Sequence, residues 1–282
     1  MDLEHLEKWI GRSETYVERI ASFPSNALAL TLNRDDPLYT DETALPPLWH
    51  WMHFLQLFKL SDAGYDGHAA LGGFLPQVPL PRRMWAGSRL NFHAPMLIGR
   101  ELTKVSTIKS VKAKTGRSGQ LVFVTVGHQF FDGETLGIDE EHDIVYREAA
   151  KPDRPLPAPP PVPDNWDFAR EIDPDPVLLF RYSALTFNGH RIHYDQPFCV
   201  NSEGYEGLVV HGPLLATLLL DLLRREKPDR AVTGFEFRAV STIYETQRFS
   251  LHGAAREDGR TYHLWARRQD GALAMDAKAT TE

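Results

Sequence analysis

The sequence has little cysteine, no excess of positive charge and no long apolar run. The single cysteine, Cys199, excludes an internal disulfide and fits a reducing compartment. A net charge of −7 argues against nucleic acid as a partner. No apolar run approaches the roughly 18 residues that a membrane span needs, and the acidic start lacks the basic head of a signal peptide. We therefore expect a cytoplasmic protein without nucleic-acid or membrane partners.

Several catalytic signatures are also missing. The sequence contains no nucleophile elbow, no phosphate-binding Walker loop and no dinucleotide fingerprint. Ser183, Cys199 and the histidines of the segment 49–53 form no recognisable nucleophile triad. Nothing in the sequence therefore signals a redox or nucleotide cofactor, and we expect none.

A proline-rich stretch divides the chain. The 282 residues exceed the usual size of one domain, while 42% hydrophobic and 24% charged residues are typical of a globular protein. Seven prolines lie between Lys151 and Pro163, and such a run forms neither a helix nor a central strand. We expect a linker at 151–166 between an N-terminal half, 1–150, and a C-terminal half, 167–282.

In the first half, apolar spacing predicts a helix over 2–20 and a buried helix over 48–60. A Gly- and Pro-rich irregular loop should follow over 61–83. Alternating patterns then predict strands at 84–92, 102–113 and 121–131, with the last two joined as a hairpin through the turn 115–119.

The second half repeats this order. Gly212-Pro213 marks a helix start, and the leucines that follow coat nearly the whole helix, which predicts burial. Strands are expected at 232–240, 246–254, 261–267 and 272–279, with Asp-Gly turns at 258–259 and 270–271. Each half is thus an antiparallel sheet wrapped round a central buried helix. The fold class is α+β, a tandem (double) hotdog.

The segment from Tyr182 to Asp195 concentrates polar chemistry behind an apolar, strand-like run at 177–180. Asn188 and His193 are five residues apart, so on one helix they would point about 140° away from each other. A break at Gly189 would remove this obstacle, because glycine closes helices cheaply. We expect a short helix over 182–187, a turn at Gly189 and an extended stretch over 192–194 that carries His193 back towards Asn188.

This segment resembles the signature of the MaoC-like, R-specific enoyl-CoA hydratase family. Residues of this chain fall on the aromatic, hydroxyl, acid, histidine and final aspartate positions: Tyr182, Thr186, Asn188, His193 and Asp195. The chain departs from the pattern at three places. Phe187 replaces a glycine, Asn188 replaces the catalytic aspartate, and His190-Arg191 replaces Asn-Pro. The variant is similar to a subgroup of mitochondrial 3-hydroxyacyl-thioester dehydratases and of mesaconyl- and itaconyl-CoA hydratases.

The resemblance implies a site in the second half that adds water to an unsaturated thioester. His193 is the candidate acid and base, since imidazole titrates near pH 6.5. Asn188 would position water or substrate. Gly212 would donate its N–H to the thioester oxygen as charge develops there. Alternatively, His193 and Asn188 are structural, and Gly212 only permits close packing.

Further residues are candidates for substrate binding. Arg191, Arg82 and Arg83 could meet a carboxylate or coenzyme A phosphates, or could instead form structural ion pairs or solvated charges. The set is completed by His190, Tyr182 and Trp85. His190 and His193 could also be read as two metal ligands, but the sequence signals no third ligand nearby, so we expect no metal.

The activity that follows is a hydro-lyase reaction on an acyl-CoA, and the resemblance points to a short branched dicarboxylic one, itaconyl- or mesaconyl-CoA, giving citramalyl-CoA. Two alternatives stay open, a dehydratase of longer 3-hydroxyacyl thioesters and a non-catalytic thioester-binding module. The first half would be non-catalytic and would complete the acyl pocket. The oligomeric state stays open, with a homodimer as one candidate.

Overall fold

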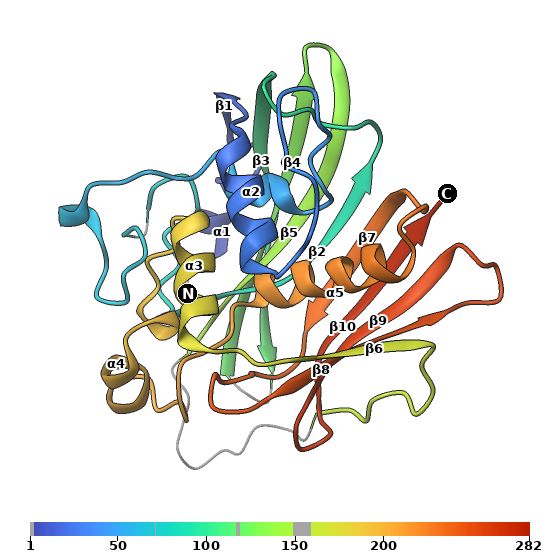
Figure 1. Ribbon diagram of the computed structural model, residues 1–282. Coiled ribbons are helices and arrows are strands. Elements are labelled where there is room, and N and C mark those ends of the chain that lie inside the picture. The colour runs from blue at the N-terminus through green and yellow to red at the C-terminus, as the bar shows by residue number, and fades with distance from the viewer. Residues whose placement is uncertain (1–2, 71, 117–118, 149–158) are drawn as a thin grey trace.

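The computed structural model describes residues 3–70, 72–116, 119–148 and 159–282 (Figure 1). Its framework is one ten-stranded antiparallel sheet in the order β1-β3-β4-β5-β2-β7-β10-β9-β8-β6. The strands of the first half are β1 (Ser13–Arg19), β2 (Arg82–Phe92), β3 (Glu101–Gly116), β4 (Gly119–Asp132) and β5 (Thr135–Arg147). Those of the second half are β6 (Phe168–Ile172), β7 (Val232–Ala239), β8 (Phe249–Ala255), β9 (Thr261–Arg268) and β10 (Leu273–Thr281).

The strand order is symmetric about the middle of the sheet, so each strand of the first half has a counterpart in the second half at the same distance from the opposite edge. Counting inwards, β1 corresponds to β6, β3 to β8, β4 to β9, β5 to β10 and β2 to β7. The central pair, β2 and β7, is antiparallel, with Ser88 opposite Phe237 and Leu90 opposite Phe235. The two halves are therefore related by an approximate twofold axis between β2 and β7, which is the repeated arrangement that the sequence predicts.

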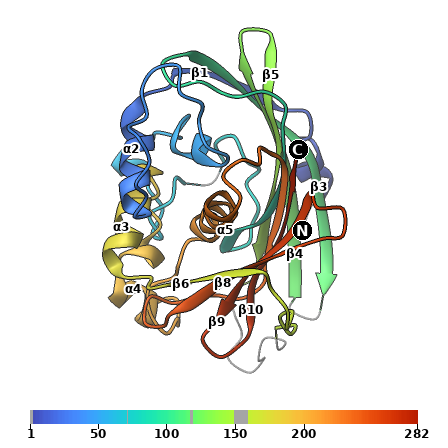
Figure 2. The ribbon, with the colours of Figure 1, turned by 45° about the vertical axis from the view of Figure 1, so that its right-hand side comes forward.

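The helices are α1 (Leu3–Glu7), α2 (Ser22–Thr31), α3 (Pro176–Leu185), α4 (Gln196–Asn201) and α5 (Gly212–Glu226), with short 3-10 turns at Trp49–Met52, Leu60–Asp62 and Arg191–His193. Figure 2 shows α5 enclosed by the curved sheet on one side and by the layer of α2 and α3 on the other. Every residue from Leu214 to Leu223 is buried, so the predicted buried helix is confirmed.

Two helices predicted in the first half are wrong. The range 2–20 contains α1, then a turn at Gly11 with φ +86°, then the edge strand β1. In the range 48–60 a single four-residue 3-10 turn lies between Leu48 and Phe54, which both adopt left-handed backbone conformations with φ 70° and 54°. The described part of the first half therefore has no long central helix, and α2, packed against α3, lies on that side of the sheet instead.

The predicted strands are present in both halves, and the irregular loop at 61–83 is confirmed as far as β2. The Asp-Gly turns are confirmed, with φ +63° at Gly259 and +88° at Gly271. The strands β1, β5 and β6 were not predicted from the sequence. Residues 117–118 of the predicted hairpin turn and residues 151–158 of the predicted linker lie outside the described residues, so the domain boundary stays a prediction. Among the described helices, none is long and apolar enough to cross a membrane.

Candidate active site

The chain reverses direction at Phe187, directly after α3. Asp175 caps the start of this helix by accepting hydrogen bonds from the Val177 and Leu178 N–H groups, so the stretch predicted as strand-like is helical. At its end Phe187 takes a left-handed conformation with φ 48°, and the Asn188 N–H donates to the Ser183 carbonyl at 2.8 Å. The break predicted at Gly189 therefore lies two residues earlier, at Phe187.

Gly189 serves a different purpose, which is a close crossing of two backbones. A Cβ at Gly189 would lie 2.8 Å from the Gly67 carbonyl oxygen, and one at Gly67 would lie 2.0 Å from the Gly189 carbonyl oxygen. The loop between β1 and β2 thus runs across the motif of the second half. Only glycine at both positions permits this approach.

Asn188 closes a local turn. Its Oδ1 accepts a hydrogen bond from the His190 N–H at 3.0 Å, an Asx-turn geometry. The predicted extended stretch at 192–194 is wrong, because Arg191–His193 forms a 3-10 turn. The amide of Asn188 therefore shapes the start of that turn, and within the described residues its NH2 group has no hydrogen-bond partner.

His193 is buried, with 7% of its surface exposed. Its Nδ1 donates to the Val209 carbonyl at 2.7 Å, which leaves the lone pair on Nε2. Burial lowers the pKa of His193 to about 3, against the opposing effect of the Val209 hydrogen bond. The imidazole is therefore neutral at pH 7 and holds its free nitrogen as a base.

His211 packs flat against His193, at a ring-centroid distance of 3.6 Å and an interplanar angle of 17°. It is 1% exposed, and its Nε2 forms a 2.8 Å hydrogen bond with the Ser183 hydroxyl. Burial, followed by the neighbouring His193, holds the pKa of His211 well below its ordinary value. His211 thus fixes the plane of the His193 ring and precedes Gly212.

The start of α5 is open beside Gly212. A Cβ added at Gly212 would meet no atom within 4 Å, so close packing does not explain this glycine. In the part of the chain that the structure describes, the Gly212 N–H has no hydrogen-bond partner. As the first amide of a 15-residue helix, it combines an unpaired donor with the partial positive charge of the helix end.

The first half contributes two residues that the sequence analysis missed, Asp66 and His68. The Asp66 carboxylate lies 3.2 Å from His68 Nδ1, and the His68 ring lies 4.1 Å from the His190 ring. His190 in turn meets His193 edge to face at 5.5 Å. Burial and the neighbouring His68 lower the pKa of His190 to about 3. A chain of side chains therefore leads from a carboxylate of the first half to His193.

Two of the three candidate arginines have carboxylate partners. The Arg191 Nε and Nη2 donate to Asp195 at 2.9 and 2.7 Å, and its guanidinium lies 4.1 Å from the Phe198 ring centroid. Arg82 is paired with Glu203 at 3.1 Å. Both arginines therefore form structural ion pairs, as the alternative to substrate binding predicted.

Arg83 is the candidate arginine without a carboxylate partner, and its guanidinium lies near the Tyr146 hydroxyl of the neighbouring strand β5. Within the described residues no carboxylate lies within ion-pair distance of it, and its charge helps to lower the pKa of His190. Its position at the start of β2, beside the motif, suits contact with an anionic group of a substrate.

Tyr182 and Trp85 contact different aromatic side chains. Tyr182 is 2% exposed and its ring is 5.1 Å from that of His211, so it supports the histidine stack from the core. Trp85 packs on His142 at 4.1 Å and on Trp51 at 4.8 Å, and its Nε1 donates to the Ser88 hydroxyl. Trp85 therefore belongs to an aromatic cluster of the first half that extends to Phe237 of β7.

Three side chains that could bind a metal ion lie close together, although the sequence predicted no metal site. Asp66, His68 and His190 offer ligand atoms that all lie within 4.8 Å of one another. His193, the partner of His190 in the sequence spacing, is not part of this group. The Asp66–His68 hydrogen bond accounts for the proximity of two of these groups without an ion.

The known proteins that are similar to this chain in sequence include hydratases and dehydratases of acyl thioesters. The family model for hydroxyacyl-thioester dehydratase type 2 matches residues 48–245. A mesaconyl-C(4)-CoA hydratase of Chloroflexus aurantiacus is 47% identical over 272 residues, which cover 95% of each chain. A mitochondrial hydroxyacyl-thioester dehydratase type 2 of Schizosaccharomyces pombe is 31% identical over 233 residues, covering 73% of this chain and 76% of the relative.

Solved structures show the same fold at low sequence identity. A MaoC-like dehydratase from Phytophthora capsici has a TM-score of 0.73 at 14% identity, covering 100% of this chain and 99% of the other. A Mycobacterium tuberculosis protein described as having a double hotdog fold has a TM-score of 0.57 at 15% identity, covering 97% and 96%. The predicted double hotdog is confirmed.

Proposed function

Since the chain belongs to the hydroxyacyl-thioester dehydratase type 2 family and is therefore a hydro-lyase, we propose that it hydrates a short branched dicarboxylic acyl-CoA of the mesaconyl-C4 type. The observation that carries the substrate class is the 47% identity to a mesaconyl-C(4)-CoA hydratase over nearly the whole of both chains. The observation that supports the chemistry is a neutral, buried His193 whose Nε2 has no partner among the described residues, and which stacks on His211 beside the open N-terminus of α5.

The reaction begins with removal of a proton from water. His193 Nε2 accepts this proton while the water oxygen bonds to the β-carbon of the unsaturated thioester. The π electrons shift, and negative charge develops on the thioester oxygen as an enolate. The Gly212 N–H and the end of the α5 dipole stabilise this charge, a contribution of typically ~3 kcal/mol for one such donor.

The second step returns the proton. The imidazolium of His193 delivers it to the α-carbon, the thioester carbonyl re-forms, and His193 becomes neutral again. Burial lowers the pKa of His193, which makes its imidazolium a stronger acid for this delivery and its neutral ring a weaker base in the first step. Asn188 holds the turn through its carbonyl oxygen, and its NH2 group has no partner among the described residues, which supports a role in orienting the water.

The substrate carboxylate would be recognised by Arg83. Its guanidinium is the one of the three candidate arginines without an ion-pair partner in the described chain, and a planar fork suits a carboxylate. Arg191 and Arg82 instead stabilise the surrounding backbone, because they donate hydrogen bonds to the Tyr65 and Glu203 carbonyls.

A substrate comparison tests this proposal. We expect mesaconyl-C4-CoA and itaconyl-CoA to be hydrated with kcat/KM values at least about tenfold above that of crotonyl-CoA, which lacks the carboxylate. The variant Arg83→Gln should remove most of this preference and leave crotonyl-CoA turnover nearly unchanged. The exposed Arg238 lies on the neighbouring strand β7, opposite Gly87, and provides the control Arg238→Gln.

A second candidate function is dehydration of longer 3-hydroxyacyl thioesters, which the family model and the Schizosaccharomyces pombe relative favour. Equal or faster turnover of 3-hydroxyoctanoyl-CoA than of the dicarboxylic substrates would select this alternative. Absence of turnover with every thioester would instead favour a non-catalytic binding module.

A further inference from the structure

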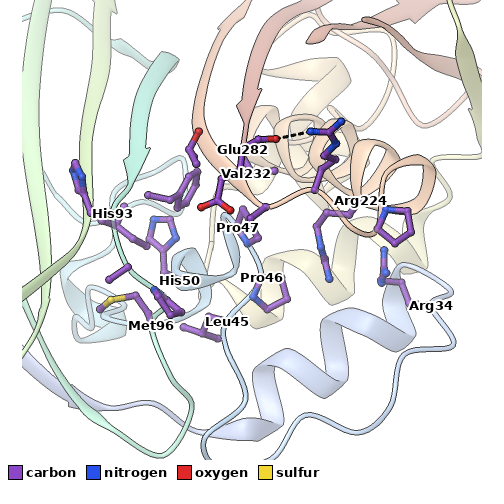
Figure 3. A pocket seen from close by; sticks show the side chains of 18 residues that line it. Arg34, Leu45, Pro46, Pro47, His50, His93, Met96, Arg224, Val232 and Glu282 are labelled. Carbon is purple, nitrogen blue, oxygen red and sulfur yellow. Dashed lines mark hydrogen bonds between the residues drawn. The ribbon is translucent and has the colours of Figure 1, made fainter. Parts of the chain in front are cut away.

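A cleft of about 440 Å³ lies between the halves at the C-terminal end of α5. Figure 3 shows His50 and Met96 of the first half on one side and Arg224 and Arg34 on the other. The wall around Pro46, Pro47 and Val232 is apolar (Figure 3). The volume lies in the range of small-molecule sites in proteins.

This cleft occupies the place that the internal twofold axis assigns to a second active site. In the second half, the Val210 N–H donates to the Ile243 carbonyl at 2.9 Å, and His211-Gly212 follows Val210. In the first half, the Leu45 N–H donates to the Met96 carbonyl at 2.7 Å, and Pro46-Pro47 follows Leu45.

The neighbouring backbone pairs extend this match. Val209 bridges to Tyr244 as Ala44 bridges to Leu97. The Glu245 N–H donates to the Leu208 carbonyl as the Ile98 N–H donates to the Thr43 carbonyl. Pro46 and Pro47 therefore stand where His211 and Gly212 stand in the candidate active site.

The substitution removes the chemistry of the first site but keeps a cleft. Pro47 has no N–H, so it cannot stabilise a thioester oxygen as Gly212 can. In place of these donors, the cleft gathers the side chains of Arg34, Arg224 and Arg230. The position that the twofold axis relates to the candidate catalytic site is thus surrounded by arginines.

The three arginines differ in how far they are neutralised. Arg34 is paired with Asp36 and with the buried Asp221. Arg230 donates to the Glu282 backbone oxygen at 2.7 Å, the contact drawn in Figure 3. Within the described residues no carboxylate lies within ion-pair distance of Arg224.

The guanidinium of Arg224 contacts two aromatic side chains of the first half, Trp49 and Tyr39. It lies 5.4 Å from the Trp49 ring centroid, and its Nη2 meets the Tyr39 hydroxyl at 3.5 Å. Its Nη1 is buried without a hydrogen-bond partner. Burying a charged donor without a partner costs free energy, so a structure that keeps Arg224 in this state is arranged for an anion.

We propose that this cleft binds a small amphipathic carboxylate, with its charge between Arg224 and Arg230 and its apolar body against Leu45, Phe92 and Val232. The protein carries a net charge of −7, yet among the described residues that line the cleft Glu282 is the sole carboxylate. The local charge thus favours an anion, and the apolar wall favours an alkyl body over inorganic phosphate.

Calorimetric titration of the full chain with octanoate tests the proposal. We expect saturable binding at one site, at least about tenfold weaker binding of the neutral isostere octanamide, and no saturable binding of inorganic phosphate at the same concentrations. Arg230→Gln should weaken octanoate binding about tenfold, and Arg224→Gln should weaken it further. Arg238→Gln should bind as the unmodified protein does.

Equal octanoate affinity in Arg230→Gln and the unmodified protein would overturn the proposal, as would the absence of saturable octanoate binding. Binding in the catalytic site also gives equal affinity, because Arg230 lies at the other end of α5. If Arg224→Gln fails to fold, Arg230→Gln decides alone, since Arg230 is exposed. The titration needs no enzymatic turnover, so it succeeds or fails independently of the proposed hydration.

Discussion

At the scale of single residues, one backbone carbonyl decides what His193 can do. Val209 accepts the Nδ1 proton, and the stacked His211 ring fixes the plane of the imidazole. Nε2 is then the only nitrogen with a lone pair, whatever enters the site. The geometry therefore favours His193 as an acid–base group that is set up before substrate binds.

We infer that Asp66 takes the place of the aspartate that the sequence lacks at Asn188. Asp66 reaches the site from the first half through His68 and His190. Burial alone would raise the pKa of Asp66, but the hydrogen bond and charge of His68 outweigh it and lower the pKa. Asp66 is thus an anion at neutral pH and favours positive charge on His190.

We predict that Asp66→Asn lowers kcat about tenfold, because the attraction that is lost, of roughly 1.4 kcal/mol, favours the imidazolium formed during proton transfer. KM should change less than about twofold. Asp66→Glu should restore part of the rate, which a purely structural role would not require. Asp62→Asn, in the same loop, is the matched control, and an equal loss there would refute the assignment.

At the scale of elements, the site depends on a loop of one half crossing a turn of the other. Gly67 and Gly189 meet backbone to backbone, and the Arg191 N–H donates to the Asp66 carbonyl at 2.8 Å. This crossing brings Asp66 and His68 to the motif. Both halves therefore contribute residues to the candidate site.

Gly67→Ala should disturb this crossing. The new Cβ would lie 2.0 Å from the Gly189 carbonyl oxygen, on a backbone with φ +87°. We expect kcat/KM to fall at least about tenfold, measured by initial rates. Gly11→Ala carries similar backbone strain at φ +86° but meets no atom within 4 Å, so it should retain activity. Unchanged turnover in Gly67→Ala would show that the crossing is not needed.

Gly212→Ala separates catalysis from packing at the start of α5. The added methyl meets no atom within 4 Å, so we expect the free energy of unfolding to stay within about 1 kcal/mol in a urea titration. The methyl would occupy the open space where the thioester is proposed to lie, and kcat/KM should fall about tenfold or more. Destabilisation without a kinetic effect would restore the packing interpretation.

The elements that the sequence predicted are those whose local signals agree with their packing. The Gly212-Pro213 start and its leucine coat produce α5, and alternation produces the strands of both halves. The helix predicted over 2–20 fails because its apolar spacing spans two elements, separated by the turn at Gly11. Tertiary contacts with β3 determine that β1 is a strand.

The residues of the candidate site also differ in how far the sequence predicts them. His193, Asn188 and Gly212 carry signals within short stretches, and the structure brings His193 next to His211, which precedes Gly212. Asp66 and His68 come from an irregular loop whose path is set by contacts made far along the chain. Their one local signal is the glycine between them, Gly67, which marks a close backbone approach.

At the scale of the whole molecule, buried histidines tie stability to pH. Seven of the 12 histidines have pKa values lowered chiefly by burial: His50, His53, His128, His190, His193, His211 and His252. In the unfolded chain they bind protons below about pH 6.5, whereas in the folded protein they stay neutral to lower pH.

The resulting stability is complete above about pH 6.5 and is lost as the pH falls towards the folded-state pKa values. Each such histidine contributes up to ~1.4 kcal/mol per pH unit in that window. We predict a smaller free energy of unfolding at pH 5.5 than at pH 7.5, measured by urea denaturation. His252→Gln should lessen the fall. Equal stability at the two pH values would contradict this account.

The most direct test of hydration at His193 is the rate of mesaconyl-C4-CoA hydration by His193→Ala, with His252→Ala as its control. His252 is also buried, at 3% exposure, and stacks on Trp265 at an interplanar angle of 8°, so its loss removes comparable packing on β8, outside the motif. The account predicts that kcat falls at least ~100-fold in His193→Ala and stays near that of the unmodified protein in His252→Ala. Hydration by His193→Ala within about twofold of the unmodified rate would contradict it.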